Sequence, residues 1–147
     1  MPRLPDGDPA PESGELPTHA LATLADGRFG IYLHVPYCAV RCGYCDFNTY
    51  TLSELGPGAS TATFADQALA ELDLAVRVLG DHARPVDTVF VGGGTPTLLP
   101  AADLVRCVDG IRARFGLSPD AEVTTEANPD SVTADDLAEL AAGGFTR

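Results

Sequence analysis

The chain has 147 residues, of which 45% are hydrophobic, and its formal net charge is -12 at pH 7. This length and composition support one modest hydrophobic core, so we expect a single domain or a part of one. The acidic excess argues against a nucleic-acid or anionic-membrane partner, and the sequence has no run of about 18 apolar residues that would span a bilayer.

Residues 1–28 are rich in Pro, Gly, Asp and Glu and show no apolar periodicity. Such a segment buries too little apolar surface to order itself, so we expect a tail that is disordered or lies loosely on the surface. It also lacks the basic start and the apolar run of a signal peptide. His19 within it is expected to be exposed to solvent, and residues 29–147 are expected to form the ordered domain.

Residues 29–36 are predicted to form the first strand, because apolar residues alternate along it and Pro36 ends the run. Tyr32 lies on the otherwise polar side of this strand. Since even that side carries an aromatic ring, we expect both faces of the strand to be covered.

Three of the four cysteines follow this strand directly, in a C-x3-C-x2-C spacing, at Cys38, Cys42 and Cys45. Three thiolates on one loop suit a [4Fe-4S] cluster, whose fourth iron then stays open for a small molecule. Two alternatives stay open, namely a structural zinc site with His34 as the fourth ligand, or a disulfide with a spare thiol.

Two longer stretches carry apolar residues at helical intervals and are predicted to be helices. The first covers residues 61–79, after a Gly-Pro-Gly linker at residues 56–58, and Gly80 closes it. The second covers residues 100–116. Cys107 borders the apolar stripe of the second helix, and we expect a buried structural thiol rather than a fourth cluster ligand, since free cysteine is among the most buried residue types.

Residues 87–91, DTVFV, form a continuous apolar run that is typical of a parallel strand buried on both faces. Three glycines follow, in the sequence GGGTPT at residues 92–97. Because glycine has no Cβ, the backbone can pass close to a ligand or to a neighbouring strand here. The run lacks the lysine of a phosphate-binding P-loop and the spacing of a dinucleotide fingerprint, so by itself it is more typical of a tight turn.

Residues 122–128 alternate in polarity and are predicted to form the third strand, with Glu126 near its C-terminal end. Without further context, a carboxylate at this place is expected to be a solvated residue at the end of a strand. Thr133 and Asp136 then predict a capped start for a third helix, which the glycine pair at 143–144 ends.

Strand and helix thus alternate three times, which specifies a parallel sheet with right-handed crossovers. The cysteine loop, the glycine run and Glu126 all fall at the C-terminal ends of successive strands. In a (β/α) barrel these ends share one face, where active sites form, so we expect one site. Residues 145–147 look like the approach to a fourth strand, and the third strand is expected to expose an unpaired edge.

The cysteine motif, with Tyr44 before its last cysteine, resembles the signature of the radical S-adenosylmethionine (SAM) enzymes. The sequence YLHVPYC at residues 32–38 is similar to the opening of the oxygen-independent coproporphyrinogen III oxidase branch of that family. The oxidases carry a further cysteine two positions after the third, whereas Phe47 stands there in this chain. That difference resembles the haem chaperones of the branch, called HemW.

The resemblance implies an α/β fold in which residues 29–147 form the first three βα units of a partial, TIM-like (β/α)6 barrel, the N-terminal portion of a radical SAM core domain. It implies that the three cysteines hold a [4Fe-4S] cluster and that SAM binds the open iron. It also implies contacts with SAM from Tyr32, Tyr44, Gly93, Gly94, Thr95 and Glu126. No catalytic residue is assigned.

As to function, the resemblance implies a haem chaperone that delivers haem to respiratory enzymes. Haem would bind outside these residues, haem-accepting respiratory proteins would be partners, and a homodimer stays open. Cysteines that must remain reduced favour the cytoplasm. Two alternatives stay open: a coproporphyrinogen III oxidase that catalyses oxidative decarboxylation in haem biosynthesis, which Phe47 argues against, and a non-catalytic iron-sulfur or zinc-binding fragment.

Overall fold

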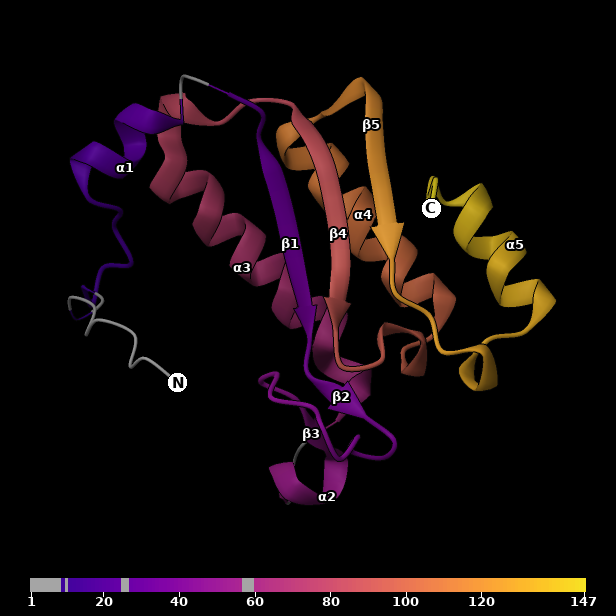
Figure 1. Ribbon diagram of the computed structural model, residues 1–147. Helices are drawn as coiled ribbons and strands as arrows, with labels where there is room; N and C mark the ends of the chain where they lie inside the picture. The colour runs from indigo at the N-terminus through magenta and orange to yellow at the C-terminus, as the bar shows by residue number, and fades with distance from the viewer. Residues whose placement is uncertain (1–8, 10, 25–26, 57–59) are drawn as a thin grey trace.

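The computed structural model describes residue 9 and residues 11–24, 27–56 and 60–147. A parallel three-stranded sheet lies at its centre in the order β1-β4-β5, with β1 (Gly30–Val35), β4 (Val86–Gly93) and β5 (Leu117–Thr125). The main helices are α3 (Phe64–Leu79), α4 (Ala101–Phe115) and α5 (Ala134–Ala142). Figure 1 shows the three strands side by side and pointing the same way. The predicted alternation of strand and helix is confirmed.

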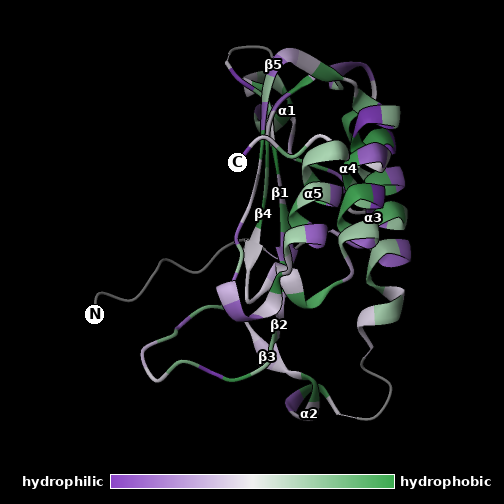
Figure 2. Ribbon diagram, turned by 90° about the vertical axis from the view of Figure 1, so that its right-hand side faces the viewer, coloured by the Kyte–Doolittle hydropathy of each residue, from purple (hydrophilic) through white to green (hydrophobic). Residues whose placement is uncertain are grey.

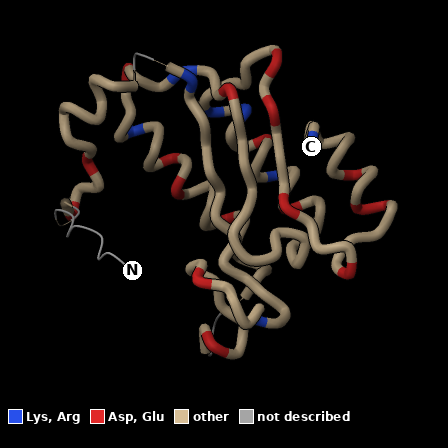
Figure 3. Tube along the Cα trace, viewed as in Figure 1, with Lys and Arg blue, Asp and Glu red and all other residues tan. Residues whose placement is uncertain are grey.

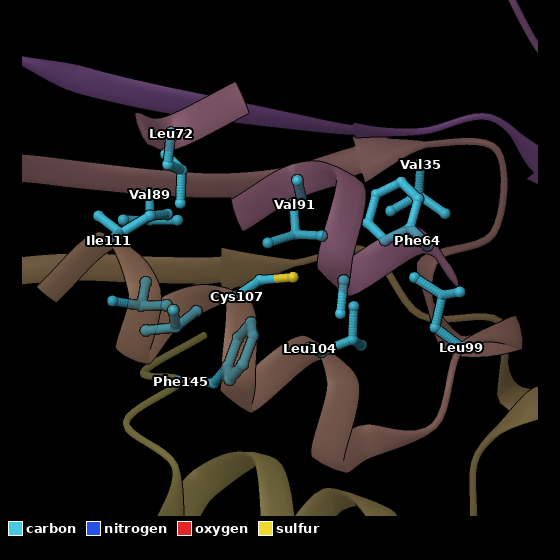
Figure 4. Close-up of a cluster of buried hydrophobic side chains, with 14 of the residues drawn as sticks. Val35, Phe64, Leu72, Val89, Val91, Leu99, Leu104, Cys107, Ile111 and Phe145 are labelled. Carbon is cyan, nitrogen blue, oxygen red and sulfur yellow. The ribbon is translucent and has the colours of Figure 1, made fainter. Parts of the chain in front are cut away.

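The hydrophobic core lies between the sheet and the helices (Figure 4). Val35, Val89 and Val91 point from the strands toward the helices, and Leu104 of α4 packs in the same cluster, all at most 1% exposed. Cys107 of α4 is 1% exposed within this cluster, as predicted for a structural thiol. Burial raises the pKa of the Cys107 thiol to about 11.

Ion pairs join the outer surfaces of α3 and α4. Arg114 Nε of α4 lies 2.7 Å from Asp73 Oδ1 of α3, and Arg106 pairs with Asp66 in the same way. A hydrogen bond from Arg114 lowers the pKa of the Asp73 carboxyl. Figure 3 shows that acidic positions are spread over α3, α5 and the ends of the strands.

The opposite face of the sheet is open, because α3, α4 and α5 all lie on one side (Figure 2). On the open face, Tyr32 of β1 and Phe90 of β4 stack with ring centroids 5.9 Å apart, and they remain 56% and 41% exposed. The prediction that both faces of residues 29–36 and 87–91 are covered is therefore wrong for the described part of the chain. Strand side chains alternate between faces, and an apolar pattern does not say which segment covers the second face.

The boundaries of the elements differ from the predictions by a few residues. Strand β5 begins at Leu117, because Leu117 pairs with Val86 before an irregularity that brings Thr88 opposite Glu122. Short 3-10 helices precede or follow the main elements at η1 (Thr61–Thr63), η2 (Gly80–His82), η3 (Pro96–Leu98) and η4 (Pro129–Ser131).

The C-terminal residues lie along the edge of β5. The N–H groups of Thr146 and Arg147 donate to the carbonyl of Val123, at 2.8 and 3.1 Å, and the Thr125 N–H donates to the Arg147 carbonyl at 3.0 Å. The predicted approach to a fourth strand thus has backbone contacts with β5, and the edge that was expected to be unpaired is partly paired.

Within the predicted tail, the described residues include a short helix, α1 (Thr18–Thr23), with no buried residue. Leu21 and Leu24 pack against the core. Of the two states predicted for the tail, these residues therefore show the one that lies on the surface of the domain, not the disordered one. His19 is exposed, as expected. Residues 1–8, 10 and 25–26 of the predicted tail and residues 57–58 of the predicted linker lie outside the described residues. No helix among the described residues is long and apolar enough to cross a membrane.

Candidate functional site

The cysteine loop leaves β1 at Pro36 and returns through a small parallel sheet. Strand β2 (Tyr37–Cys38) pairs with β3 (Tyr50–Thr51), and the Tyr50 N–H donates to the Pro36 carbonyl at 2.8 Å. Helix α2 (Leu52–Leu55) follows. In Figure 1 this part of the chain projects beyond the C-terminal ends of the main strands. The sequence analysis did not predict these short elements, which hold both ends of the loop.

Cys38, Cys42 and Cys45 are free thiols, so the alternative of a disulfide is not what the structure shows. The Cys45 N–H donates to the Cys42 carbonyl at 3.0 Å. The Cys45 sulfur lies 3.7 Å from the hydroxyl of Thr49, a side chain that is 1% exposed. No three His, Cys, Asp or Glu side chains in the described residues converge on a metal position, so the thiols share one loop without meeting at one point.

The glycine run passes directly against the start of the cysteine loop. Gly94 donates its N–H to the Val35 carbonyl at 2.8 Å, and Thr95 donates to the Tyr37 carbonyl at 2.7 Å. A Cβ at Gly94 would lie 2.3 Å from the Tyr37 oxygen and 3.0 Å from the Cys38 sulfur. Only glycine fits here, so this run is a close approach between two segments rather than a simple turn.

Glu126 follows β5 and reaches back to the glycine run. Its N–H donates to the Val91 carbonyl at 3.0 Å, and its Oε2 accepts a hydrogen bond from the Gly93 N–H, also at 3.0 Å. Gly93 has a φ of +118°, which favours glycine. Glu126 is exposed, as expected for a residue at a strand end, but its carboxylate is held by the backbone of β4.

An open cavity of about 970 Å³ lies between the cysteine loop, the glycine run and the segment after β5. Its walls include most of the residues predicted for the site, namely Cys38, Cys42, Cys45, Tyr44, Gly93, Gly94, Thr95 and Glu126. The three strand ends therefore meet at one cavity, as the sequence predicts. The roles of the individual residues stay predictions.

Tyr32 is the predicted site residue that does not line this cavity. It lies on the open face of the sheet, where its hydroxyl is 2.9 Å from His34 Nδ1. Burial, and to a lesser extent the Glu126 carboxylate, raises the pKa of Tyr32.

His34 has a role in this site that the sequence analysis missed. Its Nδ1 contacts the Tyr32 hydroxyl, and its Nε2 lies 2.8 Å from the carbonyl of Asn48, a residue at the exit of the cysteine loop. With both ring nitrogens engaged in this way, the structure gives no support to His34 as a fourth zinc ligand. The alternation of Tyr32 and His34 on one strand face was visible in the sequence, but the partner at Asn48 was not.

Comparison with known proteins places this arrangement in a family. Residues 32–147 match the Radical SAM superfamily. The chain belongs to the radical SAM superfamily. The matched range includes β4, β5 and β1 from Tyr32 onward, together with the cysteine loop, the glycine run and Glu126. The family resemblance inferred from the cysteine spacing is confirmed.

Individual members of the superfamily give a more detailed comparison. The chain is 50% identical over 133 residues to "Heme chaperone HemW" of Mycobacterium tuberculosis, covering 90% of this chain and 33% of the relative. It is 39% identical to "Heme chaperone HemW" of Escherichia coli K12, covering 80% of this chain and 30% of the relative. The chain therefore spans about a third of the length of these relatives.

Among solved structures, the chain is similar to coproporphyrinogen III oxidase (HemN) from Escherichia coli, described as a radical SAM enzyme. The TM-score is 0.69 at 30% identity, covering 87% of this chain and 29% of the other. This likeness confirms an α/β fold that forms part of the radical SAM barrel.

Proposed function

We propose that this chain is the N-terminal part of a radical SAM haem chaperone of the HemW type. In this proposal a [4Fe-4S] cluster binds to Cys38, Cys42 and Cys45. SAM binds beside it, held by Gly93, Gly94, Thr95 and Glu126 and bordered by Tyr32 and Tyr44.

The observation that carries the proposal is the cavity shared by the cysteine loop and the glycine run. On one side it offers three free thiols, the donor set that iron-sulfur clusters require. On the other side it offers the backbone of the glycine run, which lies so close to the Tyr37 carbonyl, next to the Cys38 sulfur, that Gly94 has no room for a Cβ. Thiolate donors that line one cavity with a glycine backbone and a carboxylate fit a cluster with a small polar molecule beside it.

In this proposal the cysteines, the glycine run and Glu126 make different contacts with the cluster and SAM. The three thiolates supply negative charge and leave one iron of the cluster open, which gives SAM a metal to bind when both are present. The backbone of Gly93 and Gly94 approaches the ligand closely because no side chain intervenes. The Glu126 carboxylate, fixed by the Gly93 N–H, provides an acceptor for the amino group of SAM.

The choice of chaperone over oxidase rests on Phe47. Phe47 is 59% exposed and lines the cavity, where the oxidases of the branch carry a further cysteine. The 50% identity to a protein named as a haem chaperone supports the same choice. We further propose that the whole protein binds haem outside these residues and delivers it to respiratory proteins. In this proposal the whole protein itself is located in the cytoplasm and acts as a monomer or a homodimer.

Anaerobic reconstitution with iron and sulfide, followed by EPR of the reduced protein with and without SAM, tests the binding site. We expect a [4Fe-4S] signal that changes when SAM is added and that is lost in Cys42→Ala. Cys107→Ala is the matched control, because Cys107 is buried in the core and should leave the signal unchanged. Bound metal without sulfide, or a signal that survives Cys42→Ala, would refute the proposed cluster site.

A second candidate function is the oxidative decarboxylation of coproporphyrinogen III. The structural similarity to HemN favours it. The full-length protein would separate the two functions in parallel assays for haem binding and for coproporphyrinogen decarboxylation. Decarboxylation at a catalytic rate would replace the chaperone proposal, whereas haem binding without decarboxylation would support it.

A further inference from the structure

His34 lies where three parts of the proposed site meet. It is on β1, opposite Gly92 of β4 in the register of the sheet. Its ring packs against the neighbouring Gly93, where a Cβ would come within 2.7 Å of His34 Cε1 and 2.8 Å of Nδ1. Its Nε2 reaches Asn48, three residues after Cys45, at the exit of the cysteine loop.

The two hydrogen bonds define the proton arrangement of the neutral ring. The Asn48 oxygen is a backbone carbonyl, which only accepts, so His34 Nε2 carries the proton and donates it at 2.8 Å. Nδ1 is then an acceptor, and the Tyr32 hydroxyl donates to it at 2.9 Å. The Asn48 carbonyl thus fixes the tautomer of His34, and the Tyr32 hydroxyl, which can donate or accept, is compatible with it.

The contact at Asn48 acts on the cysteine loop directly. Asn48 is followed by Thr49, which is buried and lies 3.7 Å from the Cys45 sulfur, and the Tyr50 hydroxyl donates to the Asn48 side chain at 2.6 Å. A shift of the Asn48 carbonyl therefore also moves Thr49, the residue whose hydroxyl contacts the Cys45 sulfur. On the other side of the ring, Gly93 binds Glu126 through its N–H.

We propose that His34 is a positioning residue that holds the exit of the cysteine loop at a fixed place relative to the glycine run. The chain of contacts runs from Tyr32 through His34 to Asn48, with Gly93 against the face of the ring. His34 binds neither metal nor SAM in this arrangement. Its consequence for cofactor binding rests on the proposed function, but its effect on the loop is a property of the protein without cofactors.

Alkylation of the metal-free protein measures the loop directly. The purified protein is treated with iodoacetamide at pH 8, and the rate at each cysteine is followed by mass spectrometry. In His34→Leu we expect Cys45 to react about fivefold faster than in the wild type, the change expected when one ordinary hydrogen bond that restrains a segment is lost. The rate at Cys107 should stay unchanged because it lies in the core, which also shows that the variant is folded.

Two further variants separate positioning from a general contribution to folding. His34→Gln can still present an amide N–H to the Asn48 carbonyl and should restore most of the wild-type rate at Cys45. His82→Leu alters an exposed histidine at the end of η2 and should change no cysteine rate. An unchanged rate at Cys45 in His34→Leu, or a failure of His34→Gln to restore it, would overturn the proposal.

A second measurement links the loop to the cofactors. After reconstitution, His34→Leu should hold less iron and sulfide per chain than the wild type and should show a smaller EPR change on adding SAM, while His34→Gln should approach the wild type. If wild-type protein forms no cluster, the proposed function fails while the alkylation rates still decide the role of His34. If the cluster forms equally well in His34→Leu, the proposed consequence for cofactor binding is refuted and the proposed function stands.

Discussion

Gly94→Ala tests whether the close approach between the glycine run and the cysteine loop is real. The added methyl group would lie 2.3 Å from the Tyr37 oxygen, 2.8 Å from the Tyr37 carbonyl carbon and 3.0 Å from the Cys38 sulfur. Gly94 does not have a positive φ, so the cost comes from this contact and not from the backbone conformation. The two segments must move apart to make room.

The structure sets the size of the effect. Overpacking of this kind costs about 1–3 kcal/mol. Moving the Tyr37 carbonyl also weakens the hydrogen bond that it accepts from the Thr95 N–H at 2.7 Å, which adds about 1 kcal/mol. We therefore expect Gly94→Ala to lower the free energy of unfolding by about 2–4 kcal/mol.

Urea unfolding followed by circular dichroism measures this difference. Gly43→Ala is the matched control, because Gly43 lies in the cysteine loop, has an ordinary φ, and would place its Cβ in open space. It should change the free energy of unfolding by less than about 0.5 kcal/mol. If the two variants unfold at the same urea concentration, the reasoning from the close approach is refuted.

Three other outcomes follow from the same structure. Burial raises the pKa of the Cys107 thiol to about 11. The stabilisation from burying the neutral thiol should therefore be complete below about pH 9 and be lost as the pH rises through about 11. A urea midpoint that does not fall over this pH range would contradict this expectation. Thr133→Ala removes the capping box with Asp136 and should cost about 1 kcal/mol in urea unfolding, and an unchanged midpoint would argue against it. Glu126→Gln keeps an acceptor for the Gly93 N–H but loses the charge, so SAM affinity in equilibrium dialysis should fall about tenfold while the urea midpoint stays the same; undiminished affinity would exclude Glu126 from the SAM site.

The ends of helices and strands that depend on neighbouring residues could be predicted from the sequence. The helix that begins after Thr133 was predicted from two residues three positions apart, and both side chains make the expected capping hydrogen bonds. The strand before the glycine run was predicted to end at Val91, and β4 ends two residues later, at Gly93 within the run. Caps, turns and periodicity act within a few residues, so they can be read directly from the chain.

Features that depend on contacts between distant segments were not predictable in the same way. The pairing of Tyr37 and Cys38 with Tyr50 and Thr51 involves two residues on each side, too few to leave a pattern. The hydrogen bond from His34 to a backbone carbonyl depends on the path of the loop and not on the identity of Asn48. The candidate site residues were predicted from their motifs, while the groups that hold these residues in place became visible only in the fold.

The order of the sheet has a consequence for how the chain is made. In the main sheet, the spatial order of the strands is the same as their order along the chain. Strand β4 pairs with β1, and β5 then pairs with β4. During synthesis, every new βα unit therefore meets an edge that is already formed, and Thr146 and Arg147 already lie on the latest one. The partners in these pairs are still far apart in sequence, as in the pairing of Gly30 with Thr88, so each addition closes a long loop and is expected to be slow.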